Sequence, residues 1–338
     1  MRLDAFGCSR TAYGLFLLWT AALAALVAGC ERESRAAGVD APATAEAGAE
    51  PVPTTGAMAD AETGSAAASG VPECSLFQNV AAFAVSLRES SGLARSSGSD
   101  AVLWTHNDSG GDASLAAIDL SGRTLGVVTI PGARNRDWED LASGPCPEGT
   151  CLFIGDIGDN LNERDSVTIY RVPEPAVDAG RSARARAWSV RYPGGPRDAE
   201  GLAVHPTTGE VWIVSKGRAH PVQVFRVPLP EDGESTVAEP VVSLTRGAAP
   251  VRRMVTGATF TPDGRWLLVR SYTELVFLPV DGAGVPGPAA EPAVDLTGLN
   301  ESQGEAVEAF SDGWVYFTSE AGMAGSAPML SRAYCDVG

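Results

Sequence analysis

The sequence predicts an all-β protein with the fold of a β-propeller, and three observations support this prediction. A six-residue phrase recurs at intervals of about fifty residues, and each copy is followed by a turn and a hydrophobic strand. After residue 72 no stretch has the 3.6-residue apolar period of a helix, and the apolar runs are short and separated by glycine and proline. Units of several short antiparallel strands are typical of propeller blades.

The first 29 residues are predicted to be a lipoprotein signal peptide. Arg2 and Arg10 flank the start of an apolar stretch, and Val27-Ala28-Gly29-Cys30 resembles the lipobox, where cleavage before the cysteine is followed by lipidation. The stretch is also long enough for the alternative, an uncleaved anchor helix. Both interpretations place the chain outside the cytoplasm and tethered to a membrane. By the enterobacterial sorting pattern, Glu31 favours the outer membrane.

Residues 30–72, beginning with the lipidated Cys30, are predicted to be a disordered tether. They consist largely of Ala, Gly, Pro, Thr, Ser and Glu, so they cannot bury enough apolar surface to offset the entropy lost on ordering. Residues 73–338 are long enough for one large all-β domain. The sequence therefore predicts a signal, a tether and a propeller domain.

The repeated phrase is predicted to be the innermost strand of each blade. Its copies are ESSGLA (89–94), DWEDLA (137–142), DAEGLA (198–203), MVTGAT (254–259) and QGEAVE (303–308), whose starts differ by 48, 61, 56 and 49 residues. Second strands are expected at 102–108, 151–157, 211–216, 266–272 and 314–320. Third strands are expected at 115–120, 168–173, 223–228, 274–280 and 328–334. Fourth strands are expected at 124–130, 185–192, 236–244 and 290–296. The pattern predicts five blades, with a degenerate sixth within 223–250 as the alternative.

The fifth unit shows no fourth strand of its own. The apolar segment 74–87 precedes the first unit without a partner there, so we expect it to pair in the last blade and close the ring. Cys74 and Cys335 would then meet at the ends of that blade and form a disulfide. Cys146 and Cys151 bracket the turn-like PEGT and are expected to form a second one.

The composition excludes several classes of function. The net charge is −17, the single lysine is Lys216, and no basic stripe with interleaved aromatic residues is present, which argues against a nucleic-acid partner. The chain has no GxSxG, HExxH, P-loop or CxxC motif. A monomer is expected.

Acidic residues recur at two positions of the phrase. The first position holds Glu89, Asp137, Asp198, Met254 and Gln303, and the second holds Ser91, Glu139, Glu200, Thr256 and Glu305. Residues two apart share a strand face, so six carboxylates are predicted to converge on the central channel: Glu89, Asp137, Glu139, Asp198, Glu200 and Glu305. Carboxylates without histidine or thiolate suit a hard cation, Ca²⁺ before Mg²⁺. The alternative is that they cap backbone N–H groups or pair with Arg88, Arg136 and Arg197, which each precede the phrase.

The ends of the second strands are predicted to form another ring on the same face. It contains His106, Lys216 and Arg270, and the loops THNDSGGD (105–112) and IGDIGDN (154–160) are rich in oxygen ligands and glycine. His106 is the candidate acid or base, and Lys216 and Arg270 are candidates for holding an anionic substrate. Each also has a purely structural interpretation.

These motifs, in the order SGLA…LWTHNDSGG, NRDWEDLA…GDIGDN and DAEGLA, resemble those of a family of secreted and lipid-anchored bacterial propellers. More distantly, the chain is similar to esterase-like phytases and gluconolactonase-type propellers, which implies a divalent metal at the channel mouth. We therefore expect a lipid-anchored module that binds a cation and a small molecule, polymer or envelope protein. The alternatives are a metal-dependent hydrolase of phosphoesters or lactones and a structural envelope protein.

Overall fold

The computed structural model describes residues 70–337, apart from 233 and 323–325. The predicted signal peptide, Cys30 and the tether up to residue 69 lie outside the described residues. The described residues belong to one compact unit, Ser65–Gly338. Among them, no helix has the length and apolar character needed to cross a bilayer.

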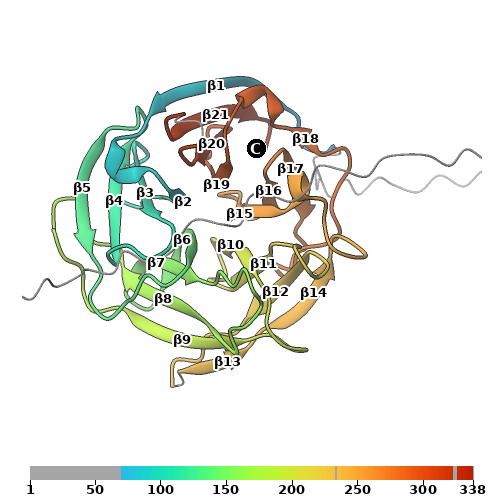
Figure 1. Cartoon of the computed structure of the whole chain (residues 1–338), viewed down its shortest axis with the longest axis horizontal. Coiled ribbons are helices and arrows are strands. Elements are labelled where there is room, and N and C mark those ends of the chain that lie inside the picture. Colours follow the sequence, from blue (N-terminus) through green and yellow to red (C-terminus); the bar gives the residue numbers. More distant parts are fainter. Residues whose placement is uncertain (1–69, 233, 323–325, 338) are drawn as a thin grey trace, which may run out of the picture. The chain divides into compact units, whose positions relative to one another are not determined.

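Five sheets surround a common centre, and each contains the four antiparallel strands of one propeller blade (Figure 1). Blade 1 contains β2 (Ser90–Arg95), β3 (Val102–Asn107), β4 (Ser114–Asp119) and β5 (Thr124–Thr129). Blade 2 contains β6 (Trp138–Cys146), β7 (Gly149–Asp156), β8 (Val167–Pro173) and β9 (Arg186–Arg191). Blade 3 contains β10 (Ala199–Val204), β11 (Val211–Ser215), β12 (Gln223–Val227) and β14 (Glu239–Ser243). Blade 4 contains β15 (Val255–Phe260), β16 (Trp266–Ser271), β17 (Glu274–Pro279) and β18 (Val294–Asp295). Blade 5 contains β19 (Gly304–Ala309), β20 (Trp314–Ser319), β21 (Met329–Cys335) and β1 (Cys74–Ala82). The prediction of a five-bladed propeller is confirmed, and the alternative sixth blade is not formed.

The N-terminal strand closes the ring as predicted. β1 pairs antiparallel with β21, with Cys74 opposite Cys335 and Ala82 opposite Met329. Cys74 is joined to Cys335 by a disulfide across 261 residues, and Cys146 is joined to Cys151. The predicted strand 74–87 ends early and continues into the 3₁₀ turn η1 (Val85–Leu87). Two further 3₁₀ turns are present, η2 (Val251–Arg253) and η3 (Thr297–Leu299).

The outer strands of blades 3 and 4 differ from the prediction. The segment expected as one strand at 236–244 is divided: β13 (Ser235–Val237) pairs parallel with β9 of blade 2, and β14 stays in blade 3. The division occurs at the buried Ala238, whose N–H donates to Arg191 O of blade 2 at 2.9 Å. In blade 4 the strand expected at 290–296 shortens to β18, because Pro292 has no N–H for a ladder bond.

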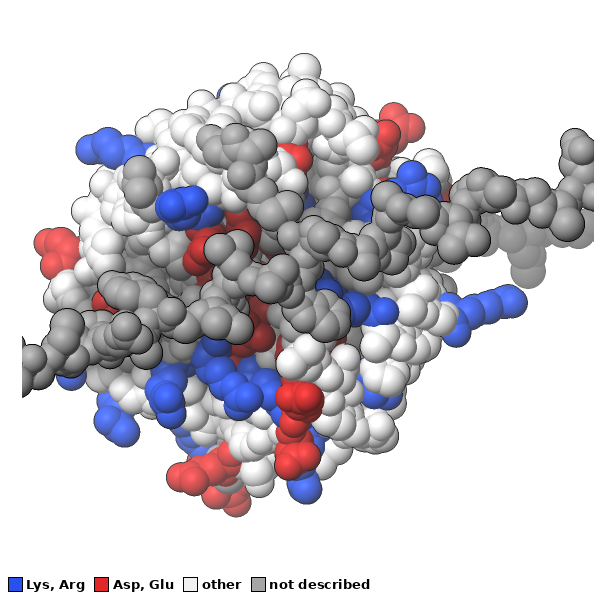
Figure 2. Space-filling model, in the orientation of Figure 1, with Lys and Arg blue, Asp and Glu red and all other residues white. Residues whose placement is uncertain are grey.

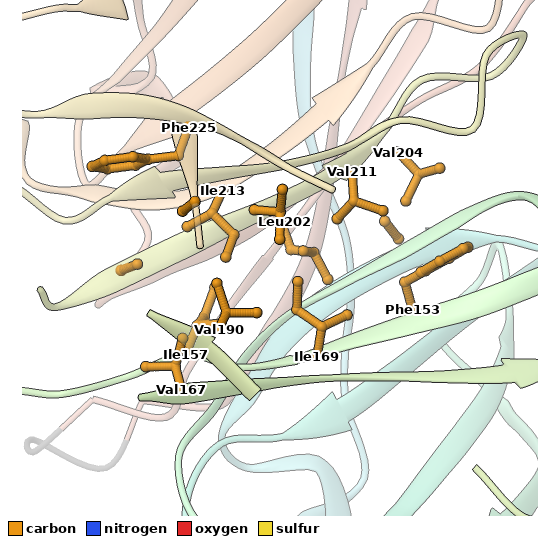
Figure 3. Close-up of a cluster of buried hydrophobic side chains, with 14 of the residues drawn as sticks. Phe153, Ile157, Val167, Ile169, Val190, Leu202, Val204, Val211, Ile213 and Phe225 are labelled. Carbon is orange, nitrogen blue, oxygen red and sulfur yellow. The ribbon is translucent and has the colours of Figure 1, made fainter. Parts of the chain in front are cut away.

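Apolar side chains fill the spaces between neighbouring blades. Figure 3 shows the cluster between blades 2 and 3, whose members include Phe153 and Ile169 of blade 2 and Leu202 and Phe225 of blade 3. Equivalent clusters lie between blades 1 and 2, 3 and 4, 4 and 5, and 5 and 1. Each blade is therefore covered on both faces by its neighbours, as a sheet with apolar faces requires. This packing fixes the inner strands around the polar centre.

Candidate functional site

Three inner strands each place a glutamate at the centre of the ring. Glu139, Glu200 and Glu305 are each exposed by 4% or less, and Glu200 is close enough to raise the pKa of the other two. Figure 2 shows acidic side chains in the middle of the face seen in Figure 1, with basic side chains beside them toward blade 2. We call this group of carboxylates the hub, and it comprises Asp108, Asp137, Glu139, Asp198, Glu200, Glu305 and Glu320.

The serine and threonine of the second repeat position connect neighbouring inner strands. Ser91 Oγ donates to Glu139 O at 2.7 Å, and Thr256 Oγ1 donates to Glu305 O at 2.9 Å. Blades 1 and 4 therefore hold the main chain of the glutamates in blades 2 and 5 instead of adding carboxylates. These contacts explain why the acidic pattern is interrupted in those two blades.

The residues at the first repeat position lie in more varied environments than those at the second. Asp198 Oδ1 accepts a hydrogen bond from Asp159 N at 2.9 Å, and Glu89 is exposed at the edge of the hub. Gln303 Nε2 donates to Glu305 Oε1 at 2.7 Å and to Glu320 at 3.0 Å. Met254 is buried in the apolar cluster between blades 3 and 4. The structure therefore places Met254 in the core, whereas Glu89 lies at the rim of the hub, where its charge raises the pKa of Glu320.

One group of carboxylates has the geometry of a cation site. Asp108, Asp137 and Glu139 each offer an oxygen, and these oxygens lie within 4.8 Å of one another. Asp108 follows β3 of blade 1, whereas Asp137 and Glu139 belong to blade 2. Sequence reasoning did not include Asp108 among the metal ligands, although the oxygen-rich loop THNDSGGD contained the signal.

The space around this group is shaped by a glycine. Gly158 follows β7, and a Cβ at that position would overlap Glu139 Oε1 and Asp137 Oδ2. Asp108 Oδ1 is buried and has no hydrogen-bond partner. An unpaired buried oxygen is costly, so these features are those of a site completed by a ligand.

Burial and mutual repulsion raise the pKa values of the hub carboxyls. Burial, followed by the charges of Asp137 and Glu320, raises the pKa of Asp108 to about 8. Burial and the neighbouring Glu89 raise the pKa of Glu320 to about 7. Burial raises the pKa of Glu139 well above its usual range, and the charge of Glu200 adds to this effect. Without a bound cation the hub therefore retains protons near neutral pH.

The single lysine of the chain lies inside the hub. Lys216 follows β11, and its Nζ pairs with Glu200 Oε1. Burial lowers the pKa of Lys216, but the carboxylate of Glu200 outweighs it and raises this pKa above its usual value. The Lys216 side chain is 7% exposed and already paired, so its predicted role in holding an anionic substrate does not fit the structure.

Arg270 and His106, the two other candidates at the second-strand ends, are both buried. Arg270 is fully buried between blades 4 and 5, where it pairs with Glu301 and donates to Ala306 O at 2.7 Å. His106 is 1% exposed, lies edge-on to Trp138 at 5.4 Å, and has its pKa lowered by burial to about 4. Their roles as acid or base and as anion holder stay predictions.

The arginines that precede the repeat phrase do not form the ion pairs that the alternative interpretation predicts. In the described part of the chain, Arg88, Arg136 and Arg197 form no ion pair with the hub. The cations that do so are Lys216 and Arg218, whose Nε lies 3.4 Å from Asp198 Oδ2. Ion pairs from the second-strand ends therefore neutralise only Glu200 and Asp198 among the carboxylates of the repeat.

The carboxylates of Asp156 and Asp159 in IGDIGDN (154–160) bond to residues that directly follow this motif. Asp156 pairs with Arg164 at 2.7 Å, and the carboxylate of Asp159 accepts the N–H groups of Glu163 and Arg164 at 2.9 and 3.0 Å.

A second cluster with metal-ligating residue types is Cys146, Glu148 and Cys151. Its two cysteines form a disulfide, so they provide no thiolate for a metal.

The carboxylate of Asp140 connects the inner strands of three blades. Its Oδ1 accepts Leu141 N at 2.8 Å, and its Oδ2 accepts Leu202 N of blade 3 at 2.8 Å and Ala258 N of blade 4 at 3.0 Å. Other copies of the phrase have glycine or alanine here; at Gly201, a Cβ would lie 2.9 Å from Ala258 Cβ. The inner strands thus leave room for one long side chain, and it joins three blades.

We expect the stability of the metal-free protein to fall as the pH rises from 5 to 8.5. Raised carboxyl pKa values mean that the folded state binds protons more tightly than the unfolded state. This stabilisation is complete below about pH 4 and is lost as the pH passes through the folded values, about 7 for Glu320 and about 8 for Asp108. The loss should be on the order of 3 kcal/mol.

Thermal melting in chelator across this pH range measures the effect. The Asp108→Asn variant should give a shallower slope, and Asp312→Asn, at an exposed turn, should not change it. A melting temperature that rises with pH in the parent would contradict the prediction.

The sequence matches no protein-family model and no curated protein. Solved structures that are similar to the chain include the following three. An aldose sugar dehydrogenase from Streptomyces coelicolor, with PQQ bound, is 12% identical over 79% of this chain and 99% of its own, with a TM-score of 0.49. A putative glucose dehydrogenase from Thermus thermophilus is 19% identical over 72% and 82%, with a TM-score of 0.43. A putative 6-phosphogluconolactonase from Bacteroides uniformis is 10% identical over 67% and 63%, with a TM-score of 0.38. Identities this low say nothing about activity, and membership of the bacterial family suggested by the motifs stays a prediction.

Proposed function

We propose that the protein is a divalent-cation-binding module of the cell envelope, which presents the cation to a ligand at the mouth of its channel. The observation that carries this proposal is the convergence of Asp108, Asp137 and Glu139 within 4.8 Å. All three provide carboxylate oxygens, the donors that Ca²⁺ and Mg²⁺ prefer. The unpartnered Asp108 Oδ1 and the space left by Gly158 fit an ion between blades 1 and 2.

The module would act outside the cytoplasm, as a monomer tethered through lipid on Cys30. The lipobox-like sequence before Cys30 supports this location, and the two disulfides fit an oxidising compartment. Its ligand would be a small molecule, a polymer or another envelope protein. Mass spectrometry of the mature N-terminus checks the anchor, and an unmodified Cys30 would exclude it.

Calcium should raise the melting temperature of the parent protein, and Glu139→Gln should abolish the rise. A ligand that binds only the folded state at about 100 times its Kd stabilises it by about 2.7 kcal/mol. For a domain of this size, this corresponds to a rise of roughly 5–10 °C. Differential scanning calorimetry in chelator, calcium and magnesium provides the measurement.

Glu308→Gln is the matched control. Glu308 is another buried glutamate of an inner strand, but it pairs with Arg95 at 2.9 Å and lies outside the cation group. It should retain the calcium response. A parent protein whose melting is indifferent to calcium, magnesium and chelator would exclude metal binding and favour a structural role.

A metal-dependent hydrolase is the second candidate, because a carboxyl beside the cation group has a raised pKa. Burial and the charge of Glu89 raise the pKa of Glu320 to about 7, which is suitable for proton transfer. A bound divalent ion would polarise a phosphoester or lactone oxygen. Screening both substrate classes with the parent and Glu139→Gln separates the candidates, since calcium binding without turnover favours the module.

A further inference from the structure

A cavity of about 630 Å³ lies between blades 2 and 3, at the end of the inner strands that is distant from the hub. It is lined by the end of β6, by the turn 207–210 between β10 and β11, and by the segment that follows β12. Cys146 at this end of β6 is roughly 20 Å along the strand from Glu139 of the hub. The volume is within the range of cavities that hold small molecules, so the cavity is a candidate site separate from the cation group.

The walls of the cavity are held by bonds that do not involve a ligand. On the side of blade 2, the disulfide between Cys146 and Cys151 closes the hairpin turn between β6 and β7. On the side of blade 3, His205 Nδ1 accepts the N–H groups of Thr207 and Thr208, each at 3.2 Å. The cavity is therefore preformed.

The lining combines apolar side chains with one buried guanidinium group. Phe153, Val211 and Val227 line the cavity and are each 2% exposed. Arg171 of β8 lines it as well; its side chain is 7% exposed, and its guanidinium carbon lies 5.2 Å from the ring centroid of Trp188. The cavity thus offers a fixed positive charge beside an apolar surface.

The carboxylates that neutralise Arg171 belong to exposed side chains. Nη1 pairs with Glu231 at 2.8 Å, Nη2 lies 3.5 Å from Glu148, and these glutamate side chains are 56% and 47% exposed. An ion pair with an exposed partner contributes little to stability, so a ligand can replace Glu148 and leave its side chain in water. Lys216 differs in this respect, because the side chain of its partner Glu200 is 3% exposed.

We propose that this cavity is a second binding site, which takes a small organic monocarboxylate with an apolar body. The ligand carboxylate replaces that of Glu148 beside Arg171 Nη2, and the apolar body packs against Phe153. One negative charge then replaces another. A phosphate dianion would add negative charge beside Glu210 and Glu231, which also line the cavity. The site does not depend on the proposed function, because it involves no residue of the hub.

NMR titration of the protein in chelator tests the proposal. Hexanoate and phenylacetate are the probes, hexanamide and phenylacetamide are their uncharged counterparts, and phenyl phosphate is the dianion. The parent should bind both carboxylates with a Kd on the order of a millimolar. It should bind the amides at least about tenfold more weakly, because they lack the charge-assisted bond to the guanidinium. Chelator keeps divalent ions out of the hub, so no carboxylate is bound there through a metal.

Two substitutions should change the affinity in opposite directions. Arg171→Met should weaken binding of the carboxylates by at least about tenfold. Glu148→Gln removes the competing charge and should tighten their binding by about two- to fivefold. Arg332→Met is the matched control and should bind as the parent does, because Arg332 also lies over a tryptophan, Trp314 at 4.1 Å, but in blade 5.

Glu148→Gln keeps the test valid if Arg171→Met fails to fold, since Glu148 is an exposed residue of a turn. Equal affinity for the carboxylates and the amides, or no binding of either, would overturn the proposal. So would affinities that neither substitution changes. Tighter binding of phenyl phosphate than of the carboxylates would make this a phosphate site and also overturn the assignment. None of these results bears on calcium binding at the hub.

Discussion

Replacing Cys74 and Cys335 by serine should lower the free energy of unfolding by about 5 kcal/mol. The disulfide closes a segment of 261 residues, so its loss restores a large entropy to the unfolded chain. It also removes the covalent link between β1 and β21, which are then joined by their ladder bonds, by side-chain bonds such as that from Arg332 to Gln78, and by the apolar packing of Phe77. Guanidinium titration measures the loss, and hydrogen exchange should show opening first in β1 and β21.

The second disulfide is the matched control for this effect. Cys146 and Cys151 are five residues apart, so the same chain-entropy reasoning gives a loss of only about 2 kcal/mol for the double serine variant. The difference between the two variants isolates the contribution of ring closure. Equal losses would show that the terminal disulfide does not limit opening of the ring.

Replacing Asp140 by alanine should lower the free energy of unfolding by about 4 kcal/mol. The substitution removes a fully buried carboxylate and leaves the N–H groups of Leu141, Leu202 and Ala258 without their acceptor. Each buried donor left unpaired costs about 1–3 kcal/mol. The melting temperature should fall by roughly 10 °C, and chemical denaturation should give the same free energy.

Two variants define the cause of this loss. Asp140→Asn retains one oxygen that can accept the bonds from blades 3 and 4, so it should cost less than Asp140→Ala. Asp312→Ala removes an exposed aspartate that accepts one bond, from Trp314 N at 3.1 Å, and should cost less than about 1 kcal/mol. If Asp140→Ala is no more destabilising than Asp312→Ala, Asp140 does not hold the three blades together.

The repeat phrase predicted the blades because each unit carries its own local pattern of short strands and turns. The same phrase identified Glu139, Glu200 and Glu305, since equivalent positions of a propeller return to the same axis. The closing strand followed from the segment around Cys74, which had no partner in the first unit. The split of 236–244 between two blades was not predictable, because β13 pairs with β9 of the preceding blade, which is distant from it in the sequence.

The candidate site was predicted less completely than the fold, for a geometric reason. Asp108 lies at the end of a strand in blade 1 and meets Asp137 and Glu139 only because two blades pack together. His106, two residues earlier, turns into the core instead. Sequence spacing does not specify side-chain direction at a strand end or after a bulge, and a bulge interrupts each inner strand at the repeat phrase.

The sequence by itself predicted five blades with a sixth left open, the closure of the ring, both disulfides and the gathering of acidic residues near the axis. These features depend on local periodicity and on repetition, which a linear pattern records. Only the tertiary structure decided which carboxylates lie together in the candidate cation site, that Lys216 is paired with Glu200, that Arg270 is buried, and that Asp140 joins three blades. Those arrangements depend on contacts between blades, where distances and burial are set by packing and not by neighbouring residues.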